Sequence, residues 1–248
     1  MRKVLKKPKM IMFDYGHTLL YEPNFDDLCG ERALFRYVTK NKNNLTPEEV
    51  SDFSAKLFKE VSKVRAVGGE IHQRQFQRTL YEYLGIELAI TYEEAELVFW
   101  QKSAPGEIMP NADKIIDFIN AEDFRSGVIS NLGFSENALC ERLDRLLPNN
   151  CFEFVIASSE YGFRKPSPYL FELALRKAGL AADEVWFCGD NIIADVEGSA
   201  KVGIFPVWYE DLIYKNPWRE ENDGLRPDCK YLHINDWTEL IKVLEGLK

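Results

Sequence analysis

A short apolar run near the start of the chain, Met10 to Phe13, ends abruptly at Asp14. Four consecutive apolar residues that no polar residue interrupts are typical of a strand that is buried on both faces of a parallel sheet. A carboxylate that follows such a strand lies at the carboxyl edge of the sheet, where open α/β proteins hold their ligands. The run therefore predicts an α/β fold and makes Asp14 a candidate functional residue.

From Pro110 onward, segments with helical periodicity alternate with short apolar segments. Strands are predicted at residues 127–130, 154–157, 185–188 and 204–209, with a last strand and helix between 231 and 247. Helices are predicted around Ile115, from about Ser135 to Leu147, from Ser167 to Ala178, and briefly after Asp195. This alternation predicts a doubly wound, mostly parallel sheet. Residues 210–228 are expected to form an irregular surface segment.

The residues between about 22 and 104 carry helical patterns and no convincing strand. Two of the four predicted helices begin with a T-x-x-E capping box, at Thr46 and at Thr91. The first helix is expected to place four apolar residues on one face: Phe25, Leu28, Phe35 and Val38. Because these helices interrupt an α/β pattern, we interpret residues 21–105 as a helical insertion into a core domain made of residues 1–20 and 106–248.

Composition excludes several classes of function. The formal net charge of -9 opposes binding to nucleic acid or to an anionic membrane surface. The basic start of the chain lacks the apolar core of a signal peptide, and no apolar run approaches the roughly 20 residues of a membrane span, so we expect a cytoplasmic protein. The five cysteines are scattered without a C-x-x-C pair, which indicates neither a disulfide framework nor a zinc site.

Polar residues follow four of the predicted strands, and in a parallel sheet these strand ends share one edge. They are Asp14, the pair Ser130 and Asn131, Lys165, and Asp190 with Asp195 five residues further on. The carboxylates suit a hard cation such as Mg²⁺, while the hydroxyl, amide and ammonium suit phosphate oxygens. Asp14 is then either a metal ligand or a covalent nucleophile that forms an aspartyl-phosphate.

These four segments are similar to the four motifs of the haloacid dehalogenase superfamily, in the same order. D-Y-G-H-T-L at 14–19 resembles the first motif, D-x-D-x-T-L, and I-S-N at 129–131 resembles the second. G-F-R-K-P-S-P around Lys165 resembles the third, and residues 189–195 match the fourth, G-D-x-x-x-x-D. The resemblance covers nearly the whole chain and implies a Rossmann-like core with the helical insertion as a C1-type cap over the pocket.

The resemblance also implies a role for each matching residue. Asp14 would be the nucleophile, Lys165 would balance the charge of Asp14 and of phosphate, and Thr18 and Ser130 would contact or support the phosphate. The implied activity is a hydrolase that acts on a small phosphorylated metabolite. Neither the substrate nor the oligomeric state follows from the sequence.

The resemblance further implies a Mg²⁺ site. Asp14 and Asp190 would bind the ion, and Asp195 would bind or orient it. The main-chain carbonyl two residues after the nucleophile is also a ligand in the family, and Gly16 can supply that carbonyl.

Gly16 departs from the family pattern, because phosphatases of the superfamily usually have a second Asp there as general acid and base. Positioned proton transfer is commonly worth about 10²- to 10⁴-fold in rate, so the sequence also fits a slow or inactive relative that binds a phosphorylated ligand. Alternatively, His17 or a cap residue supplies the proton, or the leaving group of the substrate needs no acid. Members that cleave carbon-phosphorus or carbon-halogen bonds also lack this Asp, although phosphonate cleavage would need a cap lysine (Lys56, Lys59 or Lys63) and dehalogenation would leave the metal motif without a purpose.

The part of the cap near Gly68 and Gly69 is where the resemblance places residues that choose the substrate. Candidates for this role are Arg65, Glu70, His72 and Gln73. Trp208 and Trp218 are interpreted as residues that pack against the irregular segment and not as a ligand platform.

Overall fold

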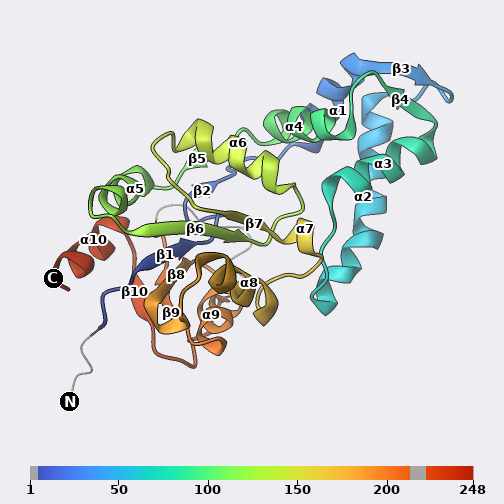
Figure 1. Cartoon of the computed structure of the whole chain (residues 1–248). Helices are drawn as coiled ribbons and strands as arrows, with labels where there is room; N and C mark the ends of the chain where they lie inside the picture. The colour runs from blue at the N-terminus through green and yellow to red at the C-terminus, as the bar shows by residue number, and fades with distance from the viewer. Residues whose placement is uncertain (1–4, 213–221, 248) are drawn as a thin grey trace.

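The computed structural model of the chain describes residues 5–212 and 222–247. Its main sheet is parallel, with the strand order β10-β9-β8-β1-β6-β7 (Figure 1). The strands are β1 (Met10–Phe13), β6 (Arg125–Ser130), β7 (Val155–Ala157), β8 (Val185–Gly189), β9 (Phe205–Tyr209) and β10 (Leu232–Ile234). Each strand lies within a residue or two of its predicted position, and the doubly wound α/β class is confirmed.

Side chains of β1 alternate between two cores, as expected for a strand buried on both faces. Ile11 and Phe13 pack in the core that also takes α5 (Ala112–Ala121), α6 (Glu136–Leu146) and α10 (Trp237–Glu245). Met10 and Met12 pack on the other face, against α8 (Pro168–Ala178), on which the short α9 (Gly198–Lys201) lies. Helices thus cover both faces of the sheet (Figure 1).

The order of the strands makes β1 the switch point of the sheet. From β1 the chain continues to β6 and β7 on one side, and it then crosses to β8, β9 and β10 on the other. Ligand crevices of open α/β sheets lie at the carboxyl ends of the strands where this reversal occurs. Asp14, the residue after β1, therefore lies at this switch point.

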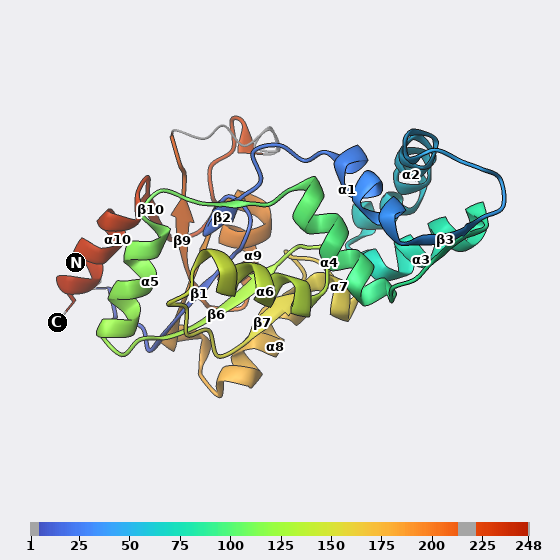
Figure 2. The same ribbon diagram turned by 90° about the horizontal axis from the view of Figure 1, so that it is seen from above.

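The helical insertion contains α1 (Asp27–Leu34), α2 (Pro47–Val61), α3 (Gln73–Leu84) and α4 (Tyr92–Ser103). Both predicted capping boxes are present, at Thr46 with Glu49 and at Thr91 with Glu94. Figures 1 and 2 show these helices gathered at one end of the molecule, on the side of α7 (Ser158–Tyr161) and away from both termini.

The prediction of no strand in the insertion is wrong. β3 (Val38–Asn41) pairs antiparallel with β4 (Ile86–Leu88), and Val38 therefore lies in a strand and not on the first helix. Phe25 precedes α1 and is 47% exposed, so the predicted apolar face of that helix is also wrong. Strands of three or four residues are too short to show an alternating pattern, and their partners lie more than forty residues apart.

Two further details differ from the prediction. Two strands of two residues each, β2 (Leu20–Tyr21) and β5 (Glu107–Ile108), pair antiparallel. They join the segment by which the chain leaves the sheet core to the segment by which it returns. The helical segment near Asp195 begins at Ile192, as a π-helical turn that precedes α9, so Asp195 lies inside it and not before it. The side chain of Asn191 caps this turn by accepting a hydrogen bond from the amide of Ala194.

Residues 210–212 and 222–228 contain no strand, as expected, and the rest of the predicted irregular segment, with Trp218, lies outside the described residues. Among the residues that the structure describes, no helix is long and apolar enough to cross a membrane.

Candidate active site

The ammonium group of Lys165 joins two carboxylates at the carboxyl edge of the sheet. Its Nζ donates a hydrogen bond to Oδ1 of Asp14 at 2.6 Å and lies 2.7 Å from Oδ1 of Asp195. It also donates to the main-chain carbonyl of Ile129, at 2.8 Å, just before Ser130. The side chain of Lys165 is 1% exposed, so these three contacts take the place of water.

The charges of Lys165, Asp14 and Asp195 shift the pKa values of Lys165 and Asp195. Burial lowers the pKa of Lys165, but the charges of Asp14 and Asp195 outweigh that effect, and the net shift of its pKa is upward. Burial also raises the pKa of Asp195 to about 6, against the opposing effect of Lys165. One ammonium beside more than one carboxylate leaves an excess of negative charge in a buried place, which favours a bound cation.

A third carboxylate completes the cluster. Asp14, Asp190 and Asp195 are all buried, and each offers an oxygen within 4.8 Å of the others. Carboxylate oxygens are ligands that Mg²⁺ prefers, so the donor set fits the ion that the sequence predicts.

Close packing and hydrogen bonds hold the backbone of Gly189 and Asp190 in place at the end of β8. A Cβ atom at Gly189 would lie 2.5 Å from the side chain of Asp195, so only glycine allows this close approach. The carbonyl of Asp190 accepts hydrogen bonds from Nε1 of Trp208, at 3.2 Å, and from Nδ2 of Asn222, at 2.9 Å. Trp208 is thus more than a packing residue, and Asn222 is a supporting residue that the sequence analysis did not identify.

Asn131 contacts the backbone of Lys165 with both ends of its amide. Its Nδ2 donates to the carbonyl of Lys165 at 2.9 Å, and its Oδ1 accepts from the amide of Lys165 at 2.7 Å. These contacts make Asn131 a support for Lys165, while its role in phosphate binding stays a prediction. Ser130, the last residue of β6, is buried at the same edge.

The turn after Asp14 brings three further candidates to this edge. Gly16 has open space beside it, because a Cβ atom there would meet nothing within 4 Å. His17 adopts a positive φ of 54°, and its amide donates to the carbonyl of Leu20. The buried Thr18 hydroxyl has no hydrogen-bond partner among the described residues, so it is available to a ligand.

The four specificity candidates of the insertion lie at its junction with the sheet core. Glu70 is paired with Arg65 and with Arg164 of the core, and His72 accepts a hydrogen bond from the amide of Arg74 through Nδ1. The amide of Gln73 donates to the carbonyl of Gly133. Arg164 was not identified from the sequence, because nothing in a local pattern signals which distant carboxylate an arginine will meet.

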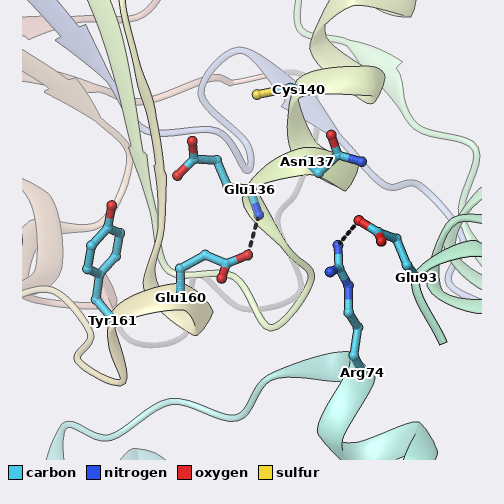
Figure 3. Close-up of a pocket in the computed structure, with 7 residues that line it drawn as sticks. All are labelled: Arg74, Glu93, Glu136, Asn137, Cys140, Glu160 and Tyr161. Carbon is cyan, nitrogen blue, oxygen red and sulfur yellow. Dashed lines mark hydrogen bonds and ion pairs between the residues drawn. The ribbon is translucent and has the colours of Figure 1, made fainter.

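A separate pocket lies at the same junction, between the insertion, the start of α6 and α7 (Figure 3). Its lining includes none of the predicted catalytic residues. Arg74 reaches Glu93 across it at 3.1 Å, and Glu160 accepts from the amide of Glu136 (Figure 3). The other lining residues are Asn137, Cys140 and Tyr161.

Comparison with known proteins identifies the family of this chain. The model of the haloacid dehalogenase-like hydrolase family matches residues 8–203. A glyceraldehyde 3-phosphate phosphatase of Methanocaldococcus jannaschii is 24% identical over 97% of this chain and 98% of its own length. One from Pyrococcus abyssi is 30% identical over 82% of this chain and 81% of its own.

The same fold occurs in a solved 2-haloacid dehalogenase from Pseudomonas syringae pv. Tomato. That structure has a TM-score of 0.62 and 22% identity, and the match covers 97% of this chain and 100% of the other. The resemblance read from the four sequence motifs is confirmed, and the chain belongs to the haloacid dehalogenase-like hydrolases.

Proposed function

We propose that the protein is a magnesium-dependent phosphatase that hydrolyses a small phosphorylated metabolite through an aspartyl-phosphate on Asp14. The observation that carries the proposal is the contact of Asp14 with Lys165 beside a cluster of three carboxylates at the switch point of the sheet. Two relatives that are named glyceraldehyde 3-phosphate phosphatase match 97% and 82% of this chain. Their names support a phosphate ester as the substrate.

In the first step a carboxylate oxygen of Asp14 attacks phosphorus, and the bond from phosphorus to the ester oxygen breaks. The leaving oxygen takes that electron pair and a proton. Lys165 holds the carboxylate in place through Oδ1 and contributes positive charge beside the phosphoryl group. The hydroxyls of Thr18 and Ser130 are suited to donating to the phosphoryl oxygens.

In the second step water attacks the phosphorus of the aspartyl-phosphate. The phosphorus–oxygen bond to Asp14 breaks, the carboxylate is restored, and inorganic phosphate leaves. We propose that the helical insertion, residues 21–105, acts as a cap that excludes bulk water from the pocket during both steps.

Mg²⁺ would be held by Asp14, Asp190 and the carbonyl of Gly16, with Asp195 binding or orienting it. When bound, the ion supplies positive charge that offsets the charge of the phosphoryl oxygens and of the carboxylates. The amide of Asn191 donates to Oδ2 of Asp195 at 3.0 Å, and Trp208 and Asn222 hold the carbonyl of Asp190 through the contacts described above.

The chain departs from its family in the source of the proton for the leaving group, because Gly16 stands where the usual Asp would supply it. The open space beside Gly16 leaves room for a leaving group or a water molecule where the usual Asp would stand. His17, next along the chain, is the auxiliary candidate. Lys56, Lys59 and Lys63 are exposed, which argues against a desolvated Schiff-base lysine for phosphonate cleavage.

The direct test is hydrolysis of an aryl phosphate by the purified protein with and without Mg²⁺. We expect activity only with the ion, and none in Asp14→Asn. Asp52→Asn, which changes an exposed carboxylate on α2, is the matched control and should behave as the wild type. Activity that survives Asp14→Asn would overturn the mechanism, and tight phosphate binding without turnover would identify a ligand-binding relative.

A further inference from the structure

Residues 68–73, which are the loop before α3 and the first residue of that helix, are joined to two loops of the sheet core. One core loop follows Asn131, and the other contains Lys165. Three backbone hydrogen bonds make the connection: Arg164 N to Gly68 O at 3.0 Å, Glu70 N to Gly162 O at 3.2 Å, and Gln73 N to Gly133 O at 2.8 Å. The helical insertion thus contacts the core beside two of the predicted catalytic segments.

The side chain of Glu70 lies at the centre of this junction and is 0% exposed. Its Oε1 accepts from Nε of Arg65 and from the amide of Ile71, both at 2.9 Å. Its Oε2 accepts from the hydroxyl of Ser158, at 2.7 Å, and from the guanidinium of Arg164. A carboxylate has about four acceptor sites, and here all are used by the protein. Glu70 therefore has no capacity left for a substrate.

The partners of Glu70 are neighbours of the residues that hold Lys165. Ser158 accepts through its hydroxyl from the amide of Leu132, at 2.9 Å, and Leu132 directly follows Asn131. Arg164 directly precedes Lys165. Glu70 is therefore linked to both ends of the contact between the Asn131 side chain and the Lys165 backbone, through Arg164 on one side and through Ser158 and Leu132 on the other.

We infer that Glu70 is a positioning residue that couples the seating of the helical insertion to the placement of the Lys165 ammonium against Asp14. The inference rests on the proposed function for its kinetic consequence. It replaces the expectation that Glu70 selects the substrate. Because the carboxylate is buried against two guanidinium groups, its loss removes a counter-charge from both and loosens the loop that carries Lys165.

The kinetic test compares Glu70→Gln with Glu60→Gln, an exposed glutamate of α2 that serves as the charge-matched control. Loss of a charge-assisted contact at the junction should lower kcat by about tenfold or more. The decrease should be the same for aryl and alkyl phosphates, with a much smaller change in KM, since Lys165 acts on Asp14 and not on the leaving group. A change confined to KM, or one that differs between substrates, would make Glu70 a substrate contact and overturn the inference.

Arg164→Gln and the double variant Glu70→Gln with Arg164→Gln complete the test. If the two residues act as one unit, the double variant should be little worse than either single variant. Decreases in kcat that multiply would show that the two side chains act separately, which contradicts the coupling.

Amide hydrogen exchange provides a readout that does not depend on activity. In Glu70→Gln, exchange should become at least several-fold faster at residues 68–73 and also at 131–133 and 162–165, while Glu60→Gln leaves all three unchanged. Faster exchange at 68–73 alone would overturn the coupling. If the wild type hydrolyses no phosphate ester, the proposed function fails, and the exchange at 162–165 still decides whether Glu70 holds the loop of Lys165.

Discussion

Lys165 and Asp14 form a buried ion pair, with Nζ 2.6 Å from Oδ1, although 151 positions separate them in the chain. The pair exists because the loop after α7 and the end of β1 meet at one edge of a parallel sheet. Two further carboxylates, Asp190 and Asp195, share the place. Lys165 therefore supports the fold as well as the proposed chemistry.

Lys165→Met should destabilise the metal-free protein. Without the ammonium, Asp14 and Asp195 remain buried without a counter-charge, and breaking such a pair costs about 3 kcal/mol or more of unfolding free energy. Mg²⁺ should restore part of this loss and stabilise the variant more than the wild type. Denaturant unfolding with and without Mg²⁺ measures both effects, with Lys63→Met at an exposed position as the control. Equal stability of the variant and the wild type without metal would contradict the prediction.

Gly16→Asp should raise turnover on alkyl phosphates more than on aryl phosphates, because alkoxide leaving groups need a proton. The structure has room for the change, since a Cβ atom at this position meets nothing within 4 Å. Steady-state kinetics on a matched alkyl and aryl pair provides the measurement.

If Gly16→Asp leaves the ratio of the two rates unchanged, another group already supplies the proton. His17→Asn then identifies that group, because Asn tolerates the positive φ of this position and lacks the imidazole. Loss of alkyl phosphate turnover in this variant would assign the proton to His17.

Glu31→Gln should remove a pH dependence from the stability of the protein. Burial raises the pKa of Glu31 from 4.5 to about 7, against a hydrogen bond from Tyr81, with Asp27 nearby. The folded state then holds a proton between these values that the unfolded state releases, so the unfolding free energy of the wild type falls as the pH rises from about 4.5 to 7.

The size of this effect follows from the pKa difference. Glu31→Gln should exceed the wild type in stability by up to about 3 kcal/mol at pH 8, and by much less at pH 5. Denaturant unfolding across this range tests it, with Glu60→Gln as the exposed control. An identical pH profile for Glu31→Gln and the wild type would show that Glu31 is ionised in the folded protein.

Arg142→Met should loosen the attachment of the helical insertion. The buried Arg142 contacts Glu22, where the chain leaves the core, and the carbonyl of Ala104, where it returns, and it lies 3.5 Å from the centre of the Trp100 ring. Removing it leaves buried acceptors without a donor, which costs about 2 kcal/mol or more of unfolding free energy.

Thermal and denaturant unfolding measure this loss, and Glu22→Gln provides the matched partner variant. Because the two side chains form one network, the double variant should lose less than the sum of the single losses. Additive losses would mean that Arg142 stabilises the protein through Trp100 and Ala104 alone.

Local patterns in the sequence determined most of the core of this protein. A four-residue run such as Met10–Phe13 is apolar because both faces of β1 are covered, and this requirement is visible without knowing the partners. Capping boxes at Thr46 and Thr91 are equally local, since each joins residues three apart. Parallel strands end at one edge, so the convergence of Asp14, Lys165 and Asp190 also follows from the order of the strands.

Only the tertiary structure decided which partner each polar side chain takes. The pairing of β3 with β4, the contact of Asn131 with the Lys165 backbone and the arginines around Glu70 all join residues far apart in the chain. A carboxylate or an amide has the same local signature whether it faces substrate, metal or a distant loop. Its role is set by which groups the fold brings within about 3 Å of it, and periodicity and spacing carry no information on that choice.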